Sequence, residues 1–248
     1  MQFFHVFGLD IPAYGTVGTL GFLLGAILAV YRCKKFGIRR EDMIYASIYA
    51  GIGVAVGGAV LYALINIPTL IEHAYLIREN LIQWLTLAFG GLVFYGGLGG
   101  GVLGGFLYCK QFKLDFLPIL EAFVPSIPLI HGIGRIACFL GGCCYGIPWS
   151  GWPGVVYSRS LAAPNGVSLF PVQLLEAGLN FILFAVLLIF SKKRRSPGRL
   201  LALYLLCYAA IRLITENFRY DEARKFFLGV STSQWISLLL IPVGLLIW

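Results

Sequence analysis

The chain has 248 residues, of which 59% are hydrophobic and only 12% are charged. A soluble globular domain carries about a quarter charged residues, so this composition excludes an ordinary soluble protein and indicates an integral membrane protein. The net charge of +8 is concentrated beside apolar stretches, where it fits a membrane-topology signal better than a nucleic-acid-binding surface. We therefore expect no nucleic-acid partner.

Apolar segments that approach the roughly 20 residues needed to cross a bilayer recur along the chain. Glycine and proline interrupt several of them, above all the third and the fourth, and we expect broken helices there. The predicted class is an all-α integral membrane protein with about seven transmembrane helices in a single domain over residues 1–248. The predicted spans are Ile11–Tyr31, Met43–Ile67, Trp84–Cys109, Phe116–Ile136, Phe170–Phe190, Leu200–Thr215 and Gln234–Trp248.

Lysine and arginine residues gather in three of the short loops between these spans, after the first, third and fifth. Loops of this kind lie on the cytoplasmic side. This predicts an external N-terminus, a cytoplasmic C-terminus and a small external segment at about residues 138–169. The basic residues are Arg32, Lys34, Lys35, Arg39, Arg40, Lys110, Lys113, Lys192, Lys193, Arg194, Arg195 and Arg199.

Two arginines lie inside or at the end of predicted spans. Arg135 ends the fourth span and Arg212 lies within the sixth. A charge in the bilayer costs about 3 to 10 kcal/mol or more, and such a residue is usually retained because it binds something negative. Arg212, Glu216 and Arg219 follow one another at i, i+4 and i+7 and share a helix face. We predict that Arg135 and Arg212 bind a phosphate while Glu216 orients a guanidinium; the alternative is a structural ion-pair network at a helix end.

The third span is unusually rich in glycine between residues 90 and 105. One interpretation is close helix packing through small residues. The other is a broken helix that lines a polar cavity, with Tyr95 pointing its hydroxyl into that cavity. The sequence leaves both interpretations open.

Cys138, Cys143 and Cys144 follow His131 within a short stretch. Their C-x4-C-C spacing is not the C-x2-C pattern of a zinc ribbon. A disulfide in an oxidising exterior, or simple packing of small residues, is favoured over a metal. We therefore expect no metal and no other cofactor, and we regard His131, one turn before Arg135, as a candidate for proton transfer.

Gln173 and Glu176 lie one turn apart at the start of the fifth span, directly after Pro171. Proline near the first position of a helix is ordinary. The two polar side chains are interpreted either as groups that face a substrate or as ordinary polarity at a membrane interface.

Several of these motifs together resemble the prolipoprotein diacylglyceryl transferase family over nearly the whole chain. The resemblance implies an enzyme of the bacterial cytoplasmic (inner) membrane. Its substrates would be phosphatidylglycerol, or a related anionic phospholipid, and the lipobox-bearing signal peptide of a preprolipoprotein. It would transfer the diacylglyceryl group to the lipobox cysteine thiol and release glycerol phosphate. The motifs are Tyr14-Gly15, the segment 94–98, the signature from Gly134 to Gly146, and the segments 171–176 and 212–219.

The resemblance and the residue chemistry together give two sets of candidate residues, one catalytic and one substrate-binding. Tyr95 stands where many family members have histidine, and Cys138 stands where many have asparagine. These departures leave open a paralogue that moves a lipid group to a different acceptor. A small non-enzymatic transporter or lipid-binding protein is the competing class. The catalytic candidates are Arg135, Arg212, Tyr95 and His131, and the substrate-binding candidates are Tyr14, Gly97, Cys138, Gly146, Gln173, Glu176, Glu216 and Arg219.

Overall fold

The computed structural model describes residues 3–6, 9–160, 162–193, 196–220, 226–227 and 229–248. Within these ranges the chain is mostly helical, with short two-stranded antiparallel sheets beside the helices. This confirms the predicted all-α class. The chain forms two compact units, of which unit 1 contains Met1–Arg32 and Glu121–Trp248 and unit 2 contains Cys33–Leu120. A single domain over residues 1–248 stays a prediction.

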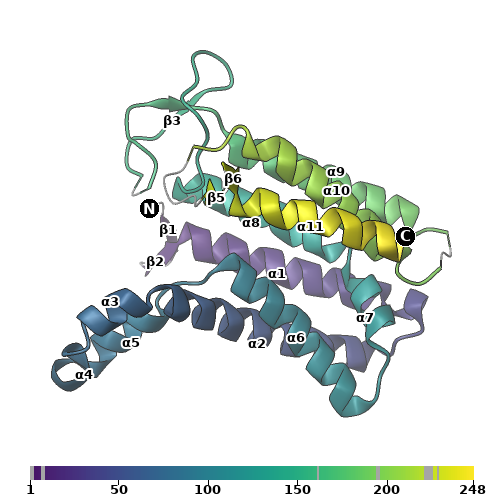
Figure 1. Ribbon diagram of the computed structural model, residues 1–248. Helices are drawn as coiled ribbons and strands as arrows, with labels where there is room; N and C mark the ends of the chain where they lie inside the picture. The colour runs from purple at the N-terminus through teal and green to yellow at the C-terminus, as the bar shows by residue number, and fades with distance from the viewer. Residues whose placement is uncertain (1–2, 7–8, 161, 194–195, 221–225, 228) are drawn as a thin grey trace. The chain divides into compact units, whose positions relative to one another are not determined.

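Unit 1 is built from apolar helices that lie side by side (Figure 1). Each contacts the next in the order α1, α8, α9, α10 and α11. The fourth predicted span is broken as expected, because α7 (Phe116–Phe123) and α8 are bent by 42° at the break before Ser126. The five helices are α1 (Ala13–Arg32), α8 (Ser126–Gly141), α9 (Val172–Phe190), α10 (Arg199–Glu216) and α11 (Thr232–Ile247).

The segment between α8 and α9 has a small core of its own. Strand β3 (Val155–Val156) pairs antiparallel with β4 (Ser168–Leu169), and Tyr145, Ala163 and Leu169 are buried beneath them. This segment corresponds to the predicted external region at about 138–169. The other short antiparallel pairs are β1 (Phe3–Val6) with β2 (Leu9–Pro12), and β5 (Phe226–Phe227) with β6 (Val230–Ser231).

Unit 2 is dominated by the close pairing of α2 (Arg40–Ile65) with α6 (Phe94–Phe112). A Cβ atom added to Gly53, Gly57 or Gly100 would collide with the backbone of the partner helix. Small residues allow such close approach between helices in a membrane. The glycine-rich stretch is therefore explained by helix packing, which was one of the two interpretations of the sequence.

The third predicted span is split in two. Helix α5 (Leu81–Phe89) ends before a short non-helical segment, and α6 begins at Phe94. The backbone N–H of Val93 in this segment donates to the carbonyl oxygen of Gly58 (3.1 Å). Such a break is tolerated at membrane depth because the exposed backbone groups find partners in the protein.

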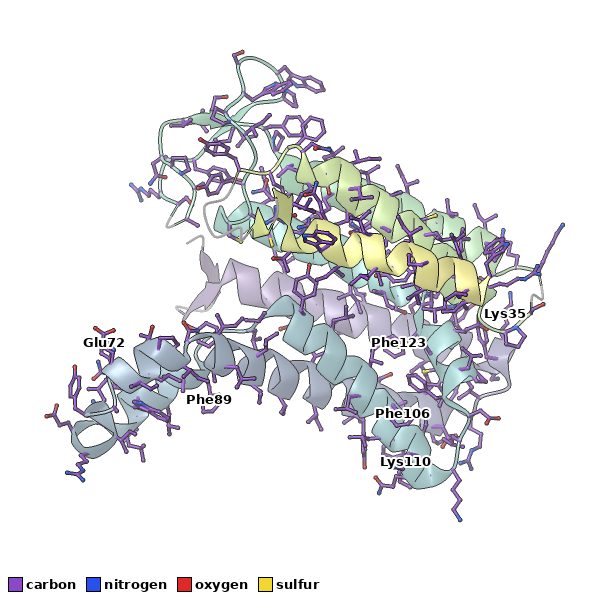
Figure 2. The ribbon with its side chains drawn as sticks, in the orientation of Figure 1. Lys35, Glu72, Phe89, Phe106, Lys110 and Phe123 are labelled. Atoms are coloured by element: carbon purple, nitrogen blue, oxygen red, sulfur yellow. The ribbon has the colours of Figure 1, made fainter. Side chains whose placement is uncertain are left out.

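Short helices extend unit 2 beyond one end of α2 (Figure 1). They are α3 (Ile67–Glu72), α4 (Leu76–Glu79) and α5, while the short 3-10 helix η1 (Cys33–Phe36) precedes α2. Figure 2 shows Glu72 and Phe89 in this extension and Lys110 at the far end of α6. Charged residues at both ends with apolar side chains between them suit a unit that crosses a bilayer.

By length and apolar composition, three helices in the described ranges are able to cross a membrane, or four if α7 and α8 form one span. These findings support the integral membrane class. The other predicted spans are also helical, but α6 carries seven glycines, α10 contains Arg212 and Glu216, and α11 has only 16 residues. Seven spans and an external N-terminus stay predictions. The three helical segments are Gly15–Phe36, Arg40–Ile65 and Val172–Phe190.

Candidate active site

Polar side chains of unit 1 meet where four helix ends come together. The C-terminal ends of α8 and α10 lie beside the N-terminal ends of α9 and α11 (Figure 1). Residues 131, 135 and 138 share one face of α8 because they are spaced at i, i+4 and i+7. We call the cluster formed at this end the arginine site, and it consists of His131, Arg135, Glu176, Arg212 and Glu216.

Glu176 lies at the centre of the arginine site. Its Oε1 atom is 2.9 Å from Nη2 of Arg135, and its Oε2 atom is 3.4 Å from Nη1 of Arg212. The residue is only 1% exposed, so its charge is shielded from water and depends on these two guanidinium groups. The interpretation of Glu176 as ordinary interfacial polarity is therefore wrong.

Arg212 is held from three sides. Its Nη1 atom faces Glu176, its Nη2 atom forms an ion pair with Oε2 of Glu216 (2.9 Å), and Nη2 also donates to Oγ of Ser233 (2.8 Å). The structure thus pairs Arg212 with Glu216 as the i, i+4 spacing predicts. The fixed fork of a guanidinium makes such multiple contacts possible.

The charges of the arginine site cancel on their own, because Arg135 and Arg212 face Glu176 and Glu216. The nearby Arg219 raises the sum for these five charged residues to +1. A buried site with an excess positive charge favours an anionic ligand.

His131 contacts both charged partners on its side of the site. Nε of Arg135 donates to Nε2 of His131 (3.2 Å), which places the proton of the neutral imidazole on Nδ1. The same Nε2 atom lies 3.4 Å from Oε1 of Glu176. The ring of Tyr208 lies beside the imidazole, with ring centroids 5.7 Å apart. His131 therefore positions the Arg135 guanidinium in this arrangement.

The chain turns back sharply at the end of α8, within the segment Cys138–Gly146, which we call the signature turn. Gly142 and Cys144 both have left-handed backbone conformations, with φ of 69° and 55°. The backbone N–H of Cys143 donates to the carbonyl oxygen of Cys138 (3.1 Å). A left-handed residue just after a helix is a common way to satisfy its last carbonyl groups.

Gln173 supports this turn from α9. Its Nε2 atom donates to the carbonyl oxygen of Cys143 (2.9 Å) and to Oη of Tyr157 (3.4 Å), and Tyr157 donates in turn to the carbonyl oxygen of Phe139 (3.2 Å). Burial raises the pKa of Tyr157 to about 12, so this phenol remains a proton donor. The Oε1 atom of Gln173 is buried and has no hydrogen-bond partner among the described residues.

The signature turn brings three thiols together. The sulfur atoms of Cys138, Cys143 and Cys144, here called the thiol cluster, all lie within 4.8 Å of one another. The three cysteines are free, so the disulfide considered from the sequence is not formed. Hydrogen bonds from the other two thiols hold the pKa of Cys144 below its ordinary value.

Gly146 joins the signature turn to the segment after α10. It forms an isolated antiparallel bridge with Arg219, and the backbone N–H of Ile147 donates to the carbonyl oxygen of Phe218 (3.0 Å). A Cβ atom at Gly146 would collide with the carbonyl oxygen of Phe170 and lie 2.8 Å from that of Phe218. Only glycine fits this close approach.

The remaining predicted residues belong to α1 and α6. Tyr95 and Gly97 belong to α6 in unit 2, where Gly97 packs against Val54 of α2. Tyr14 falls in α1, but its side chain lies outside the described residues. The predicted roles of these three residues in the reaction remain predictions.

Sequence reasoning missed Ser233 and Tyr208. Ser233 lies in the first turn of α11, inside the Ser231–Gln234 capping box. The sequence therefore indicates only a residue at the start of a helix. Tyr208 precedes Arg212 by four residues, so helical spacing alone would have placed it on the face of the arginine site.

The fold and the site define an integral membrane protein with a buried cluster of paired charged side chains at one end of a helix assembly. The chain belongs to the prolipoprotein diacylglyceryl transferase family, whose sequence model matches residues 1–248. The predicted resemblance is thereby confirmed, and the family is one of enzymes.

Named relatives cover the chain almost from end to end. The phosphatidylglycerol–prolipoprotein diacylglyceryl transferase of Clostridium tetani is 36% identical over 245 residues, which is 99% of this chain and 95% of the relative. The transferase 2 of Clostridium perfringens is 32% identical over 98% of this chain and 92% of its own length. The transferase of Clostridioides difficile is 29% identical over 98% of this chain and 92% of its own length.

Proposed function

We propose that this protein transfers the diacylglyceryl group of phosphatidylglycerol to the lipobox cysteine thiol of a preprolipoprotein and releases glycerol phosphate. The observation that carries the proposal is the meeting of Arg135 and Arg212 around the buried Glu176 in a member of this family. The names of the relatives specify phosphatidylglycerol as the donor and a prolipoprotein as the acceptor.

The reaction is a displacement at carbon. The thiol sulfur attacks the glycerol carbon that carries the phosphate, a carbon–sulfur bond forms, and the carbon–oxygen bond to the phosphate breaks. The electron pair of that bond leaves on the phosphate oxygen, and the thiol proton passes through a protein base to water. Negative charge therefore grows on the phosphate in the transition state, and fixed cations in a dry site stabilise it best.

The arginine site meets this need with donors that are already oriented. Arg135 uses Nε for His131 and Nη2 for Glu176, and no hydrogen bond within the described ranges involves its Nη1 group. That group is available to a phosphate oxygen. The unpaired Oε1 atom of Gln173 offers an acceptor to a lipid hydroxyl. Cys138, Gly146, Glu216 and Arg219 complete the proposed lipid site.

Proton transfer is assigned to Tyr95 or His131, with Tyr14 and Gly97 lining the substrate path. A tyrosine with a pKa of about 10 is a poor base unless a neighbouring arginine lowers that value. His131 has to release the N–H of Arg135 before its Nε2 atom accepts a proton. Binding of a phosphate to Arg135 favours that release, because the anion competes with His131 for the guanidinium N–H groups.

The proposed setting is the bacterial cytoplasmic membrane, with seven spans and an external N-terminus. The arginine site and the signature turn then lie toward the outer leaflet. There they meet phosphatidylglycerol laterally and the lipobox as the signal peptide emerges from the membrane. The basic loops face the cytoplasm in this arrangement.

The test is a transfer assay with purified protein in detergent, phosphatidylglycerol and a lipobox peptide, followed by mass spectrometry. The proposal predicts a diacylglyceryl–cysteine adduct and an equal amount of glycerol phosphate. Both products should disappear in Arg135→Ala and persist in Arg159→Ala, since Arg159 is an exposed arginine of the external segment. Glycerol phosphate without an adduct would indicate another acceptor, and neither product from folded protein would favour a transporter or a lipid-binding protein.

A further inference from the structure

The proposed function gives Cys143 and Cys144 no role, and it uses Cys138 only to line the lipid site. Cys138 lies on the last turns of α8, and the signature turn returns Cys143 and Cys144 to it, so that the three sulfur atoms lie within 4.8 Å of one another. The C-x4-C-C spacing fits no zinc-ribbon pattern, and for that reason a metal was not favoured from the sequence.

The turn holds these sulfur atoms in place by several independent contacts. Cys144 adopts a left-handed conformation that glycine would accept more readily, and strained residues of this kind gather at functional sites. The amide of Gln173 fixes the carbonyl group of Cys143, and the Cys143 thiol donates to the carbonyl oxygen of Cys138 (3.7 Å). The cluster is therefore organised before any ligand binds.

We propose that Cys138, Cys143 and Cys144 bind a zinc ion whose fourth position is open to the acceptor thiol. A zinc–sulfur length of about 2.3 Å with tetrahedral angles places the bound sulfurs about 3.8 Å apart, so the cluster has to contract by no more than about 1 Å. Three protein ligands with one open position are the usual composition of a catalytic zinc site, whereas structural sites are closed by a fourth ligand.

The surrounding charges suit this complex. Zinc with three thiolates carries a charge of −1, and coordination of a fourth thiolate makes it −2. Arg135 lies one turn before Cys138 on α8, and it interacts electrostatically with both Cys138 and Cys144. Arg219 interacts with Cys144 in the same way. The guanidinium groups of Arg135 and Arg219 thus offset the charge of the metal complex, and Arg135 also serves the phosphate.

This inference rests on the proposed function and supplies the step that Tyr95 is poorly suited to perform. The acceptor cysteine coordinates zinc and loses its proton to water, because a thiol bound to zinc is deprotonated. The zinc-bound sulfur then attacks the glycerol carbon, the carbon–sulfur bond forms, and glycerol phosphate leaves with the electron pair of the broken carbon–oxygen bond. Zinc keeps its oxidation state throughout, so no oxidant or reductant is needed.

The binding test uses cobalt(II) and zinc(II) with the full-length, reduced protein in detergent. We expect about one metal ion per chain and a thiolate-to-cobalt absorption band, both lost in the double variant Cys143→Ser/Cys144→Ser. Cys207→Ser is the matched control, because Cys207 lies in α10 outside the cluster. The inference is overturned if reduced, folded wild-type protein gives no band, or if the double variant binds as the wild type does.

A second readout needs no variant. Zinc should protect Cys138, Cys143 and Cys144 of the wild type from maleimide and leave the labelling of Cys207 unchanged, as measured by peptide mass spectrometry. Equal labelling of the cluster with and without zinc would contradict the site. This measurement keeps the inference testable if the double variant does not fold.

The transfer assay separates the metal from the proposed function. We expect chelation to lower adduct formation at least 100-fold and added zinc to restore it. Metal-free protein that forms the adduct at the full rate would overturn the role of zinc in the reaction. Cobalt binding without any transfer from zinc-loaded protein would leave the metal site standing and refute the proposed function instead.

Discussion

Replacing Glu176 by glutamine removes the central negative charge of the arginine site and keeps the shape of the side chain. Glu176 is 1% exposed, and its carboxylate lies 2.9 Å from Arg135 and 3.4 Å from Arg212. A neutral amide cannot balance these guanidinium groups. The variant therefore leaves positive charge buried with less compensation, and we expect a large loss of stability.

The structure sets the size of this loss. Removing one partner of a buried ion pair costs about 3–5 kcal/mol. Arg212 keeps Glu216 at 2.9 Å, and the Arg135 side chain is 12% exposed, so both groups retain some compensation. We therefore expect the lower end of that range, about 3 kcal/mol. For a chain of this size that corresponds to a fall in the unfolding temperature of about 6–12 °C.

The assay is thermal unfolding in detergent followed by intrinsic fluorescence. The matched control is Glu121→Gln, since Glu121 is also buried in unit 1 and, among the described residues, its Oε1 atom accepts the backbone N–H groups of Gly198 (2.8 Å) and Leu200 (3.3 Å). A glutamine oxygen still accepts these bonds, so we expect a loss of about 1 kcal/mol or less. Equal unfolding temperatures for the two variants would refute the central role of the Glu176 charge.

Three further predictions concern activity and packing. Arg212→Lys keeps the charge but loses the guanidinium fork, so we expect kcat for adduct formation to fall about 100-fold; an unchanged kcat would contradict that role. Gly100→Ala should lower the unfolding temperature, because its methyl group meets the backbone of α2, whereas Gly99→Ala has open space and should not. Gly146→Ala should impair folding or turnover where Gly134→Ala, with nothing within 4 Å, is tolerated. Equal behaviour within either glycine pair would contradict the packing.

The helices of this fold were largely predictable because each is an apolar segment with a clear end. The fifth predicted span, Phe170–Phe190, appears as Val172–Phe190, and glycine and proline marked the breaks before α6 and α8. The number of membrane crossings was less predictable. Helix α6 packs its backbone against α2 through its glycines, and glycine adds little to the hydropathy of a segment. Composition alone therefore does not distinguish a transmembrane helix from a helix packed inside the protein.

The site was predictable where its contacts are local. Arg212 and Glu216 are four residues apart on one helix, and the sequence placed them together. The central position of Glu176 depends on the packing of α8, α9 and α10, and no spacing encodes it. The thiol cluster depends on the left-handed conformation of Cys144, which the intrinsic preference of cysteine does not predict.

The most direct test of the central claim is the kinetics of Arg135→Ala and Arg212→Ala in the transfer assay, with each variant first shown to unfold cooperatively. If the two guanidinium groups stabilise the leaving phosphate, kcat should fall about 100- to 1000-fold in each variant while KM for phosphatidylglycerol changes much less. Normal turnover by folded Arg212→Ala would contradict this account of the site.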